Sequence, residues 1–154
     1  MANCHFAVST GTGLDSVSDI FRRPIVYANY DSMMHLVMWS NSISSPKKLY
    51  LKEENRYLSL TEYFQHSYFN SHLYDKNLIK VIDLNENEIR DAVMEMEARL
   101  SNSWIDSAAD KELQKLFMNI YVRWHEYPKY HGWMNPEAFI GSSYLKNMPE
   151  SFFN

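Results

Sequence analysis

The sequence predicts an α/β protein built on a mainly parallel sheet with helices on its faces. Three short apolar segments, residues 5–8, 25–28 and 78–82, have the composition of buried β-strands. Segments with the periodicity of amphipathic helices separate them, and this alternation is typical of parallel sheets. Three strands are few for a complete doubly wound domain. We therefore expect residues 1–154 to form a single, incomplete domain with a partial Rossmann-like sheet and an aromatic-rich C-terminal tail.

The start of the chain has the order of a βαβ unit. A turn of small residues at 9–13 connects the strand at 5–8 to an amphipathic helix expected over residues 14–21. Pro24 ends this helix and introduces the strand at 25–28. The apolar residues of the helix share one face: Leu14, Val17, Ile20 and Phe21.

The middle of the chain alternates polar and apolar segments. The apolar run at 33–39 is expected to form one or two turns of helix, and the polar stretch at 41–46 a loop. Residues 48–51 predict a short edge strand, and residues 52–56 an exposed turn. The polar stretch at 66–77 predicts another loop.

Side chains that cap helices mark the helix starts. Ser59 and Glu62 form a capping box that begins a helix reaching about residue 69. Asn85, with Glu88 three residues later, begins the next helix. The apolar stripe of this helix predicts its buried face: Ile89, Val93, Met96 and Leu100.

The last third of the chain begins with a long helix and ends in an aromatic tail. Either Asp106 or Ser107 caps the helix, which runs to about residue 127 because Pro128 ends it. Residues 129–154 are irregular, with short helices expected from Pro136 and near Ser143. The tail aromatics either pack over the flank of the sheet, which we favour, or form a surface for self-association.

Composition excludes several classes of protein. The net charge of −4 argues against a general nucleic-acid binder. No apolar run has the length of a membrane span, and the N-terminus has no signal-peptide pattern, so a cytoplasmic location is expected. The single cysteine, Cys4, precedes a strand and is expected in the core. The six histidines match no metal-binding spacing, so we expect no metal site. No cofactor is expected either.

The turn at 9–13 is the strongest candidate for a binding site. It consists of Ser9, Thr10, Gly11, Thr12 and Gly13. A turn of small residues before a helix presents free backbone amides, and the helix dipole favours an anion there. The alternative is an ordinary strand-to-helix turn with a Thr or Ser cap. The turn matches neither the P-loop nor the GxGxxG pattern.

Charged residues elsewhere are weaker candidates. Lys47 and Lys48 could supply cations to a phosphate-rich ligand, whereas the pair at 22–23 follows a helix and suits its C-terminal dipole. The acidic residues of the helix that follows Asn85 are expected to form a solvated face: Glu86, Glu88, Glu95 and Glu97.

Four stretches together resemble a known family. They are GTGLDSVSDIFRRPIVYANY (11–30), SPKKLYLKEENRYLSLTEYF (45–64), VIDLNENEIRDAVMEMEARL (81–100) and AFIGSSYLKNMPESF (138–152). In this order they resemble the C-terminal, nucleotide-sugar-binding half of two-domain (GT-B) glycosyltransferases of bacterial surface-carbohydrate synthesis. A more distant resemblance is to the C-terminal domain of UDP-N-acetylglucosamine 2-epimerases.

The resemblance implies a role for the turn. The turn at 9–13 would hold the diphosphate of a nucleotide-sugar donor, and Asp15 or Asp19 would contact the donor sugar or ribose. The helix lacks the Glu that many such transferases carry, and transfer would need an N-terminal domain for the acceptor. The sequence identifies no catalytic residue.

Two functional hypotheses follow. In the first, the chain binds a nucleotide sugar as part of a glycosyltransferase-like protein and is not catalytic alone; an epimerase-like protein is a weaker variant. In the second, the chain is a non-catalytic remnant or interaction domain that forms homo-oligomers through its aromatic surface.

Overall fold

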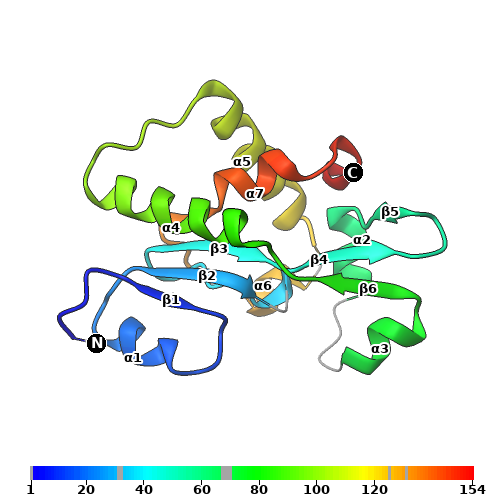
Figure 1. Cartoon of the computed structure of the whole chain (residues 1–154), viewed down its shortest axis with the longest axis horizontal. Coiled ribbons are helices and arrows are strands. Elements are labelled where there is room, and N and C mark those ends of the chain that lie inside the picture. Colours follow the sequence, from blue (N-terminus) through cyan, green and yellow to red (C-terminus); the bar gives the residue numbers. More distant parts are fainter. Residues whose placement is uncertain (1, 31–32, 67–70, 125, 131) are drawn as a thin grey trace.

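The computed structural model describes residues 2–30, 33–66, 71–124, 126–130 and 132–154, and it is a mixed α/β structure with two sheets (Figure 1). The first sheet is wholly parallel, with strand order β1-β2-β3-β7. Its strands are β1 (Ala7–Ser9), β2 (Ile25–Tyr30), β3 (Ser42–Pro46) and β7 (Ala138–Ile140). The parallel sheet flanked by helices confirms the predicted α/β class and is compatible with a Rossmann-like fold.

Helices and loops cover both faces of the parallel sheet. Helix α4 (Glu86–Leu100) packs on one face, where Val26 and Ile43 of the sheet form a cluster with Ala92 and Met96 of the helix. The opposite face carries helix α1 (Asp15–Ile20) and the connection from β2 to β3, which includes the 3₁₀ turn η1 (Met33–His35). Helices α1 and α4 lie on opposite sides of the sheet in Figure 1.

The second sheet is antiparallel and has the order β5-β4-β6. It consists of β4 (Lys48–Leu51), β5 (Arg56–Tyr57) and β6 (Ile79–Ile82). Only Lys47 separates β3 from β4, so the chain passes directly from one sheet to the other. The short helices α2 (Leu60–Gln65) and α3 (Ser71–Lys76) connect β5 to β6.

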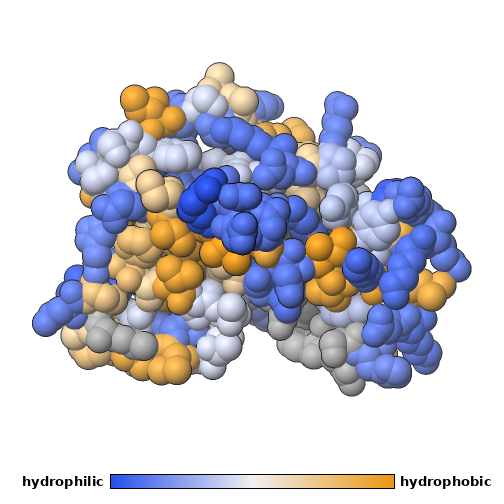
Figure 2. Space-filling model, in the orientation of Figure 1, coloured by the Kyte–Doolittle hydropathy of each residue, from blue (hydrophilic) through white to orange (hydrophobic). Residues whose placement is uncertain are grey.

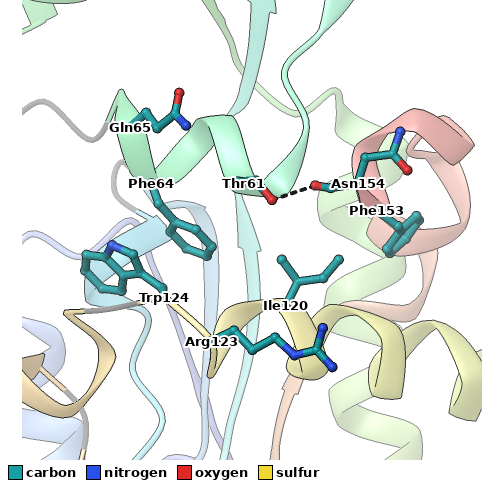
Figure 3. A pocket seen from close by; sticks show the side chains of 8 residues that line it. All are labelled: Thr61, Phe64, Gln65, Ile120, Arg123, Trp124, Phe153 and Asn154. Atoms are coloured by element: carbon teal, nitrogen blue, oxygen red, sulfur yellow. Dashed lines mark hydrogen bonds between the residues drawn. The ribbon is translucent and has the colours of Figure 1, made fainter.

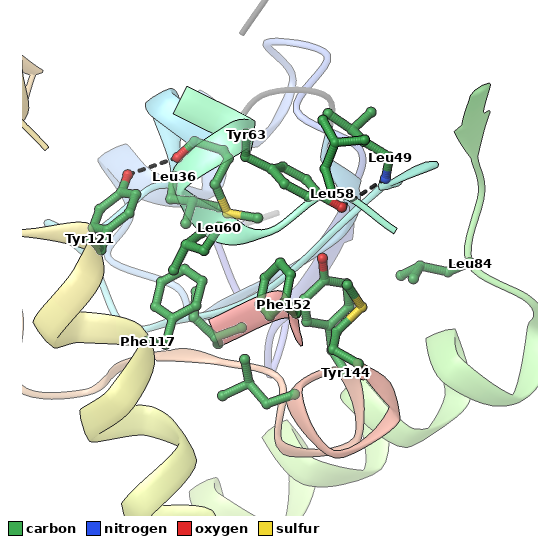
Figure 4. Packing of buried hydrophobic residues seen from close by; sticks show 14 of the residues in the cluster. Leu36, Leu49, Leu58, Leu60, Tyr63, Leu84, Phe117, Tyr121, Tyr144 and Phe152 are labelled. Atoms are coloured by element: carbon green, nitrogen blue, oxygen red, sulfur yellow. Dashed lines mark hydrogen bonds between the residues drawn. The ribbon is translucent and has the colours of Figure 1, made fainter. Parts of the chain in front are cut away.

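The main core lies where the two sheets meet the C-terminal helices (Figure 4). Phe117 and Tyr121 of one helix pack against Leu60 and Tyr63 of α2, and Phe152 is fully buried among them. The Tyr63 hydroxyl accepts a hydrogen bond from the Leu49 amide at 2.7 Å. The C-terminal elements are α5 (Ala108–Tyr121), α6 (Tyr127–Tyr130), α7 (Ser142–Asn147) and η2 (Glu150–Phe153).

The predicted helix starts are confirmed. Ser59, Asn85 and Ser107 each cap their helix with a side-chain oxygen, and each forms a capping box with the acidic residue three positions later. These interactions are confined to one turn of chain, which explains why the sequence alone reveals them. The buried stripe of α4 is also confirmed, with Met96 buried and the other three residues packed partly against the core.

Three predictions of irregular or helical structure are wrong. The segment predicted as a loop at 41–46 contains β3, a buried strand between β2 and β7. The two neighbouring strands form hydrogen bonds with its backbone, and its small serine side chains fit within the close-packed sheet. The predicted loop at 66–77 contains α3, although residues 67–70 lie outside the described residues. The helix expected from Pro136 is replaced by β7, which adds to the sheet beside β3.

Smaller differences concern position and length. The strand at 48–51 is the central strand of its sheet and not an edge strand. The long helix α5 ends at Tyr121, and Pro128 lies inside α6 instead of stopping α5. Cys4 is half-buried and not a core residue, since it precedes β1, which is only partly covered.

Two acidic residues expected on a solvated face are buried. Glu88 and Glu95 turn inward from α4, where Glu88 pairs with Lys48 of β4, and Glu95 accepts hydrogen bonds from Arg99 and from Ser142 of α7. A buried carboxylate requires such partners, and these come from residues distant in the sequence.

The exposed apolar residues do not lie where the sequence analysis expected them. The tail aromatics Tyr144 and Phe152 are buried, whereas Trp133 is 70% exposed, so the predicted packing of the tail is confirmed only in part. The apolar face of α1 is exposed instead, and Figure 2 shows apolar residues gathered at the end of the molecule where β1 and α1 lie. No helix of the described chain has the length and apolar character needed to cross a membrane.

Candidate functional site

The predicted βαβ unit is present and presents its turn at one edge of the parallel sheet. Strands β1 and β2 pair in parallel through α1, with Val8 opposite Val26 and Ser9 opposite Tyr27. Ser9 of the predicted turn is the last residue of β1, and the rest of the turn at 9–13 follows the carboxyl end of this strand. In open α/β sheets, ligands bind in the crevice outside the carboxyl ends of the strands.

The turn satisfies part of its own backbone. The Gly11 amide donates to Ser9 Oγ at 3.0 Å, and the Gly13 amide donates to Asp15 Oδ1 at 2.8 Å. Within the described part of the chain no side chain caps α1, which is only six residues long. The Gly11 and Gly13 amides, which were expected to bind an anion, thus already donate to side chains of the protein. The acceptor of the Gly13 amide is itself a carboxylate, that of Asp15.

The two aspartates of α1 contact their own neighbourhood. Tyr27 of β2 is buried beside them, and this burial, together with the charges of Asp15 and Asp19, raises the pKa of the Tyr27 hydroxyl. Asp19 Oδ2 accepts a hydrogen bond from the Trp39 indole at 2.8 Å. Asp15 therefore lies at the turn, whereas Asp19 faces the β2–β3 connection.

Gly11 is required by its surroundings. Its φ of 82° lies in the left-handed region, and a Cβ at this position would lie 2.4 Å from Cε2 of Tyr30. Gly13 also has a positive φ, 89°, but no atom of the described residues lies within 4 Å of its Cβ position. The ring of Tyr30 therefore packs directly against the backbone of the turn at Gly11.

Two adjoining hollows open beside the turn, with volumes of about 480 and 340 Å³. We call them together the turn pocket, and Thr10, Thr12 and Asn29 line both. The larger hollow extends over Ser9 and Asp15 toward α4, and Gly13 lines neither. Neither threonine hydroxyl has a hydrogen-bond partner within the described ranges.

The smaller hollow brings a cation to the turn. It is lined by Gly11 on one side and by Lys47 and Asp83 on the other. Lys47 Nζ lies 3.3 Å from Asp83 Oδ1, and the Lys47 amide donates to the Tyr30 carbonyl. Lys47 follows β3 directly, so the carboxyl ends of β1, β2 and β3 all contribute to the turn pocket.

Other predicted cations lie elsewhere. Lys48 points into the interior and pairs with Glu88, so it is unavailable to a ligand. Arg23 donates from Nε to the Ala2 carbonyl at 2.7 Å, and neither it nor Arg22 lines the turn pocket. In the part of the chain that the structure describes, no three His, Cys, Asp or Glu side chains converge as metal ligands would.

The sequence analysis did not identify Asn29 and Asp83. Asn29 has a φ of 56°, and its Oδ1 accepts a hydrogen bond from the Leu84 amide at 2.6 Å, which ties β2 to the start of α4. An asparagine at the end of an apolar strand is a recognisable signal, because asparagine tolerates the left-handed region better than most residues. Asp83 carries no comparable local signal.

The turn pocket can hold an anion through two hydroxyls, backbone groups and one ammonium group. It contains no cysteine, histidine or serine paired with a base among its lining residues, so it offers no activated nucleophile. No protein-family model, curated protein or solved structure matches this chain.

Proposed function

We propose that the chain binds a nucleotide sugar through its diphosphate, as the donor-binding part of a GT-B-type glycosyltransferase. One observation carries the proposal: the turn pocket lies at the carboxyl ends of three parallel strands and places Lys47 opposite Thr10 and Thr12. This is the edge of an α/β sheet where phosphate-containing ligands are held. The resemblance of four stretches of the sequence to such transferases supports the same conclusion.

The local hydrogen bonds suggest where the diphosphate would lie. Because Asp15 already accepts from the Gly13 amide, a second anion at that amide would be repelled. We therefore assign the diphosphate to the side of Thr10, Thr12 and Lys47, where the hydroxyls and the ammonium group can donate to it. The Lys47–Asp83 ion pair would exchange for a Lys47–phosphate pair on binding.

Glycosyl transfer itself requires further groups. The turn pocket holds two carboxylates, of Asp15 and Asp83, and Asp15 is engaged with the Gly13 amide. A base that activates an acceptor would have to come from outside this pocket. Binding of the donor is thus the activity that this chain is expected to show by itself.

Binding can be tested and located in one experiment. The chain contains only four glycines, so ¹⁵N-glycine labelling gives four amide signals. UDP, GDP, CMP and ADP sugars are titrated while these signals are followed by NMR and the heat by calorimetry. We expect Gly11 to shift on binding while Gly132 and Gly141 stay unchanged. Absence of binding by every donor contradicts the proposal.

Lys47 and Lys52 provide a matched pair of variants. Each ammonium group pairs with an exposed aspartate, Asp83 at 3.3 Å and Asp75 at 3.5 Å, but of the two lysines Lys47 is the one that lines the turn pocket. We expect Lys47→Gln to weaken donor binding by about tenfold, the effect of one charge-assisted hydrogen bond, and Lys52→Gln to leave it unchanged.

A second candidate function is self-association, and the exposed face of α1 favours it. Leu14, Ile20 and Phe21 are 64%, 76% and 50% exposed, and Val8 of β1 is 53% exposed. Strand β1 also has β2 as its only neighbour among the described strands, which leaves an open sheet edge. A second copy of the chain could cover this edge and α1 together.

Measurement of the oligomeric state tests the second candidate. Analytical ultracentrifugation should show a dimer that Ile20→Lys dissociates. Ile105→Lys is the control, because Ile105 is 87% exposed and lies outside β1 and α1. A monomer at all concentrations, or equal effects of the two variants, contradicts self-association through this face.

A further inference from the structure

A third hollow, of about 620 Å³, lies between α2, the end of α5 and η2 (Figure 3). We call it the aromatic pocket. It shares no lining residue with the turn pocket, so conclusions about it do not depend on the proposed function. Its volume lies in the range of small-molecule sites, which is about 300–1,000 Å³.

The wall of the aromatic pocket is apolar and built from three elements. Phe64 of α2 stacks on Trp124, with ring centroids 5.2 Å apart and planes 10° from parallel. Figure 3 shows these two rings on one side of the hollow, Phe153 of η2 on the other, and Ile120 of α5 between them. Phe64 also contacts Tyr121, with ring centroids 5.6 Å apart and planes at 50°. The part of the Phe64 ring that lines the hollow can contact a planar ligand group.

The wall is held in place before any ligand binds. Trp124 is 7% exposed, and its amide donates to the Tyr121 carbonyl. Thr61 Oγ1 donates to the Asn154 carbonyl at 2.7 Å, which fixes the end of η2 against α2. A preformed pocket binds more tightly because less conformational freedom is lost on binding.

The guanidinium group of Arg123 carries a positive charge at the rim of the hollow. The guanidinium group of Arg123 lines the hollow and has no hydrogen-bond or ion-pair partner among the residues that the structure describes. The carboxamide of Gln65 lines it too and is equally without a partner in those ranges. Guanidinium groups bind carboxylates with two parallel hydrogen bonds.

We propose that the aromatic pocket binds a small aromatic carboxylate, with the ring against Phe64 and the carboxylate on Arg123. The stacked wall selects a planar apolar body. The unpaired guanidinium selects an anion over a neutral analogue of the same shape. The combination of both features in one preformed hollow distinguishes this site from an ordinary surface depression.

Two ligands of equal size test the proposal. 1-Naphthoate and 1-naphthamide differ in charge and share the ring system, and their binding to the full chain is measured by calorimetry. We expect 1-naphthoate to bind at least tenfold more tightly, which corresponds to one charge-assisted contact. Equal affinities, or no binding below ~1 mM, overturn the proposal.

Variants locate the binding site. Arg123→Gln should lower the affinity for 1-naphthoate about tenfold and leave 1-naphthamide binding unchanged. Phe64→Leu should weaken both ligands, while Arg90→Gln is the control, because Arg90 is exposed and lies outside the pocket. Circular dichroism confirms that each variant is folded. An equal effect of Arg123→Gln and Arg90→Gln on 1-naphthoate overturns the assignment.

Discussion

The ring of Tyr30, at the end of β2, lies directly against Gly11 in the turn after β1, where a Cβ would come 2.4 Å from Tyr30 Cε2. Neither residue is close to the other in sequence, but the parallel pairing of β1 and β2 brings them together. This contact sets the position of the backbone that lines the turn pocket.

Gly11→Ala should therefore destabilise the fold more than Gly13→Ala. Both positions have positive φ, so each substitution costs about 1–2 kcal/mol of backbone strain. Only at Gly11 does the new methyl overlap a ring, which adds roughly 1–3 kcal/mol. Urea unfolding measures both, and Tyr30→Ala should remove the difference between the two variants. Equal destabilisation by the two alanines contradicts the contact.

The buried ion pair between Lys48 and Glu88 predicts an asymmetry between single and double variants. Both side chains are nearly inaccessible, at 11% and 8% exposure. Lys48→Met should destabilise the protein by about 3–5 kcal/mol, because it leaves the Glu88 carboxylate buried without its cation.

The double variant is the control for this prediction. Adding Glu88→Gln removes the unpaired charge, and the glutamine can still accept from the Asn85 amide, as Glu88 does at 3.0 Å. The double variant should then be more stable than Lys48→Met alone in urea unfolding. A further loss of stability in the double variant would show that the unpaired Glu88 carboxylate does not cause the destabilisation by Lys48→Met.

The ion pair of Arg56 and Glu62 predicts a pH dependence of stability. Hydrogen bonding to Arg56 lowers the pKa of Glu62 from 4.5 to about 2. Because the folded state has the lower pKa, the stabilisation is complete above pH 4.5 and is lost as the pH falls toward 2. Glu62→Gln should lower stability at pH 7 and flatten the stability curve within this window.

Glu54 is the matched control for Glu62. It also pairs with Arg56, at 2.7 Å, but its side chain is 56% exposed against 28% for Glu62. Glu54→Gln should change stability little, because exposed ion pairs are screened by water. Thermal unfolding between pH 2 and 7 compares the two variants. Identical curves of stability against pH would show that the pH-dependent stabilisation does not come from Glu62.

Replacement of Glu95 should destabilise the packing of α4 against α7. Its carboxylate accepts from the Ser142 amide at 2.7 Å, the Ser142 hydroxyl at 3.0 Å and Arg99 at 2.8 Å. Glu95→Ala removes the acceptor for these groups at a site that is 1% exposed, and should cost about 3 kcal/mol. Glu97→Ala, at a side chain 52% exposed, should change stability by less than about 0.5 kcal/mol. Denaturant unfolding measures both, and similar losses would contradict the structural role of Glu95.

The acidic residues of α4 show where sequence analysis fails. Glu88 and Glu95 have the composition of a solvated face, and no local pattern distinguishes them from Glu86 and Glu97. Their burial depends on Lys48 and Ser142, which the chain brings from 40 and 47 residues away. The same limit applies to the turn pocket, in which Lys47 meets Thr10 only through the parallel strand order.

The sequence by itself determined the features that depend on a few neighbouring residues. These are the helix starts at Ser59, at Asn85 and at residues 106–107, the βαβ order at the start of the chain, and the turn that follows its first strand. Only the tertiary structure decided that the serine-rich segment at 42–46 is an inner strand and that the face of α1 stays exposed. The physical reason is range: capping requires side chains within one helical turn, whereas a polar segment becomes a strand only when neighbouring strands satisfy its backbone.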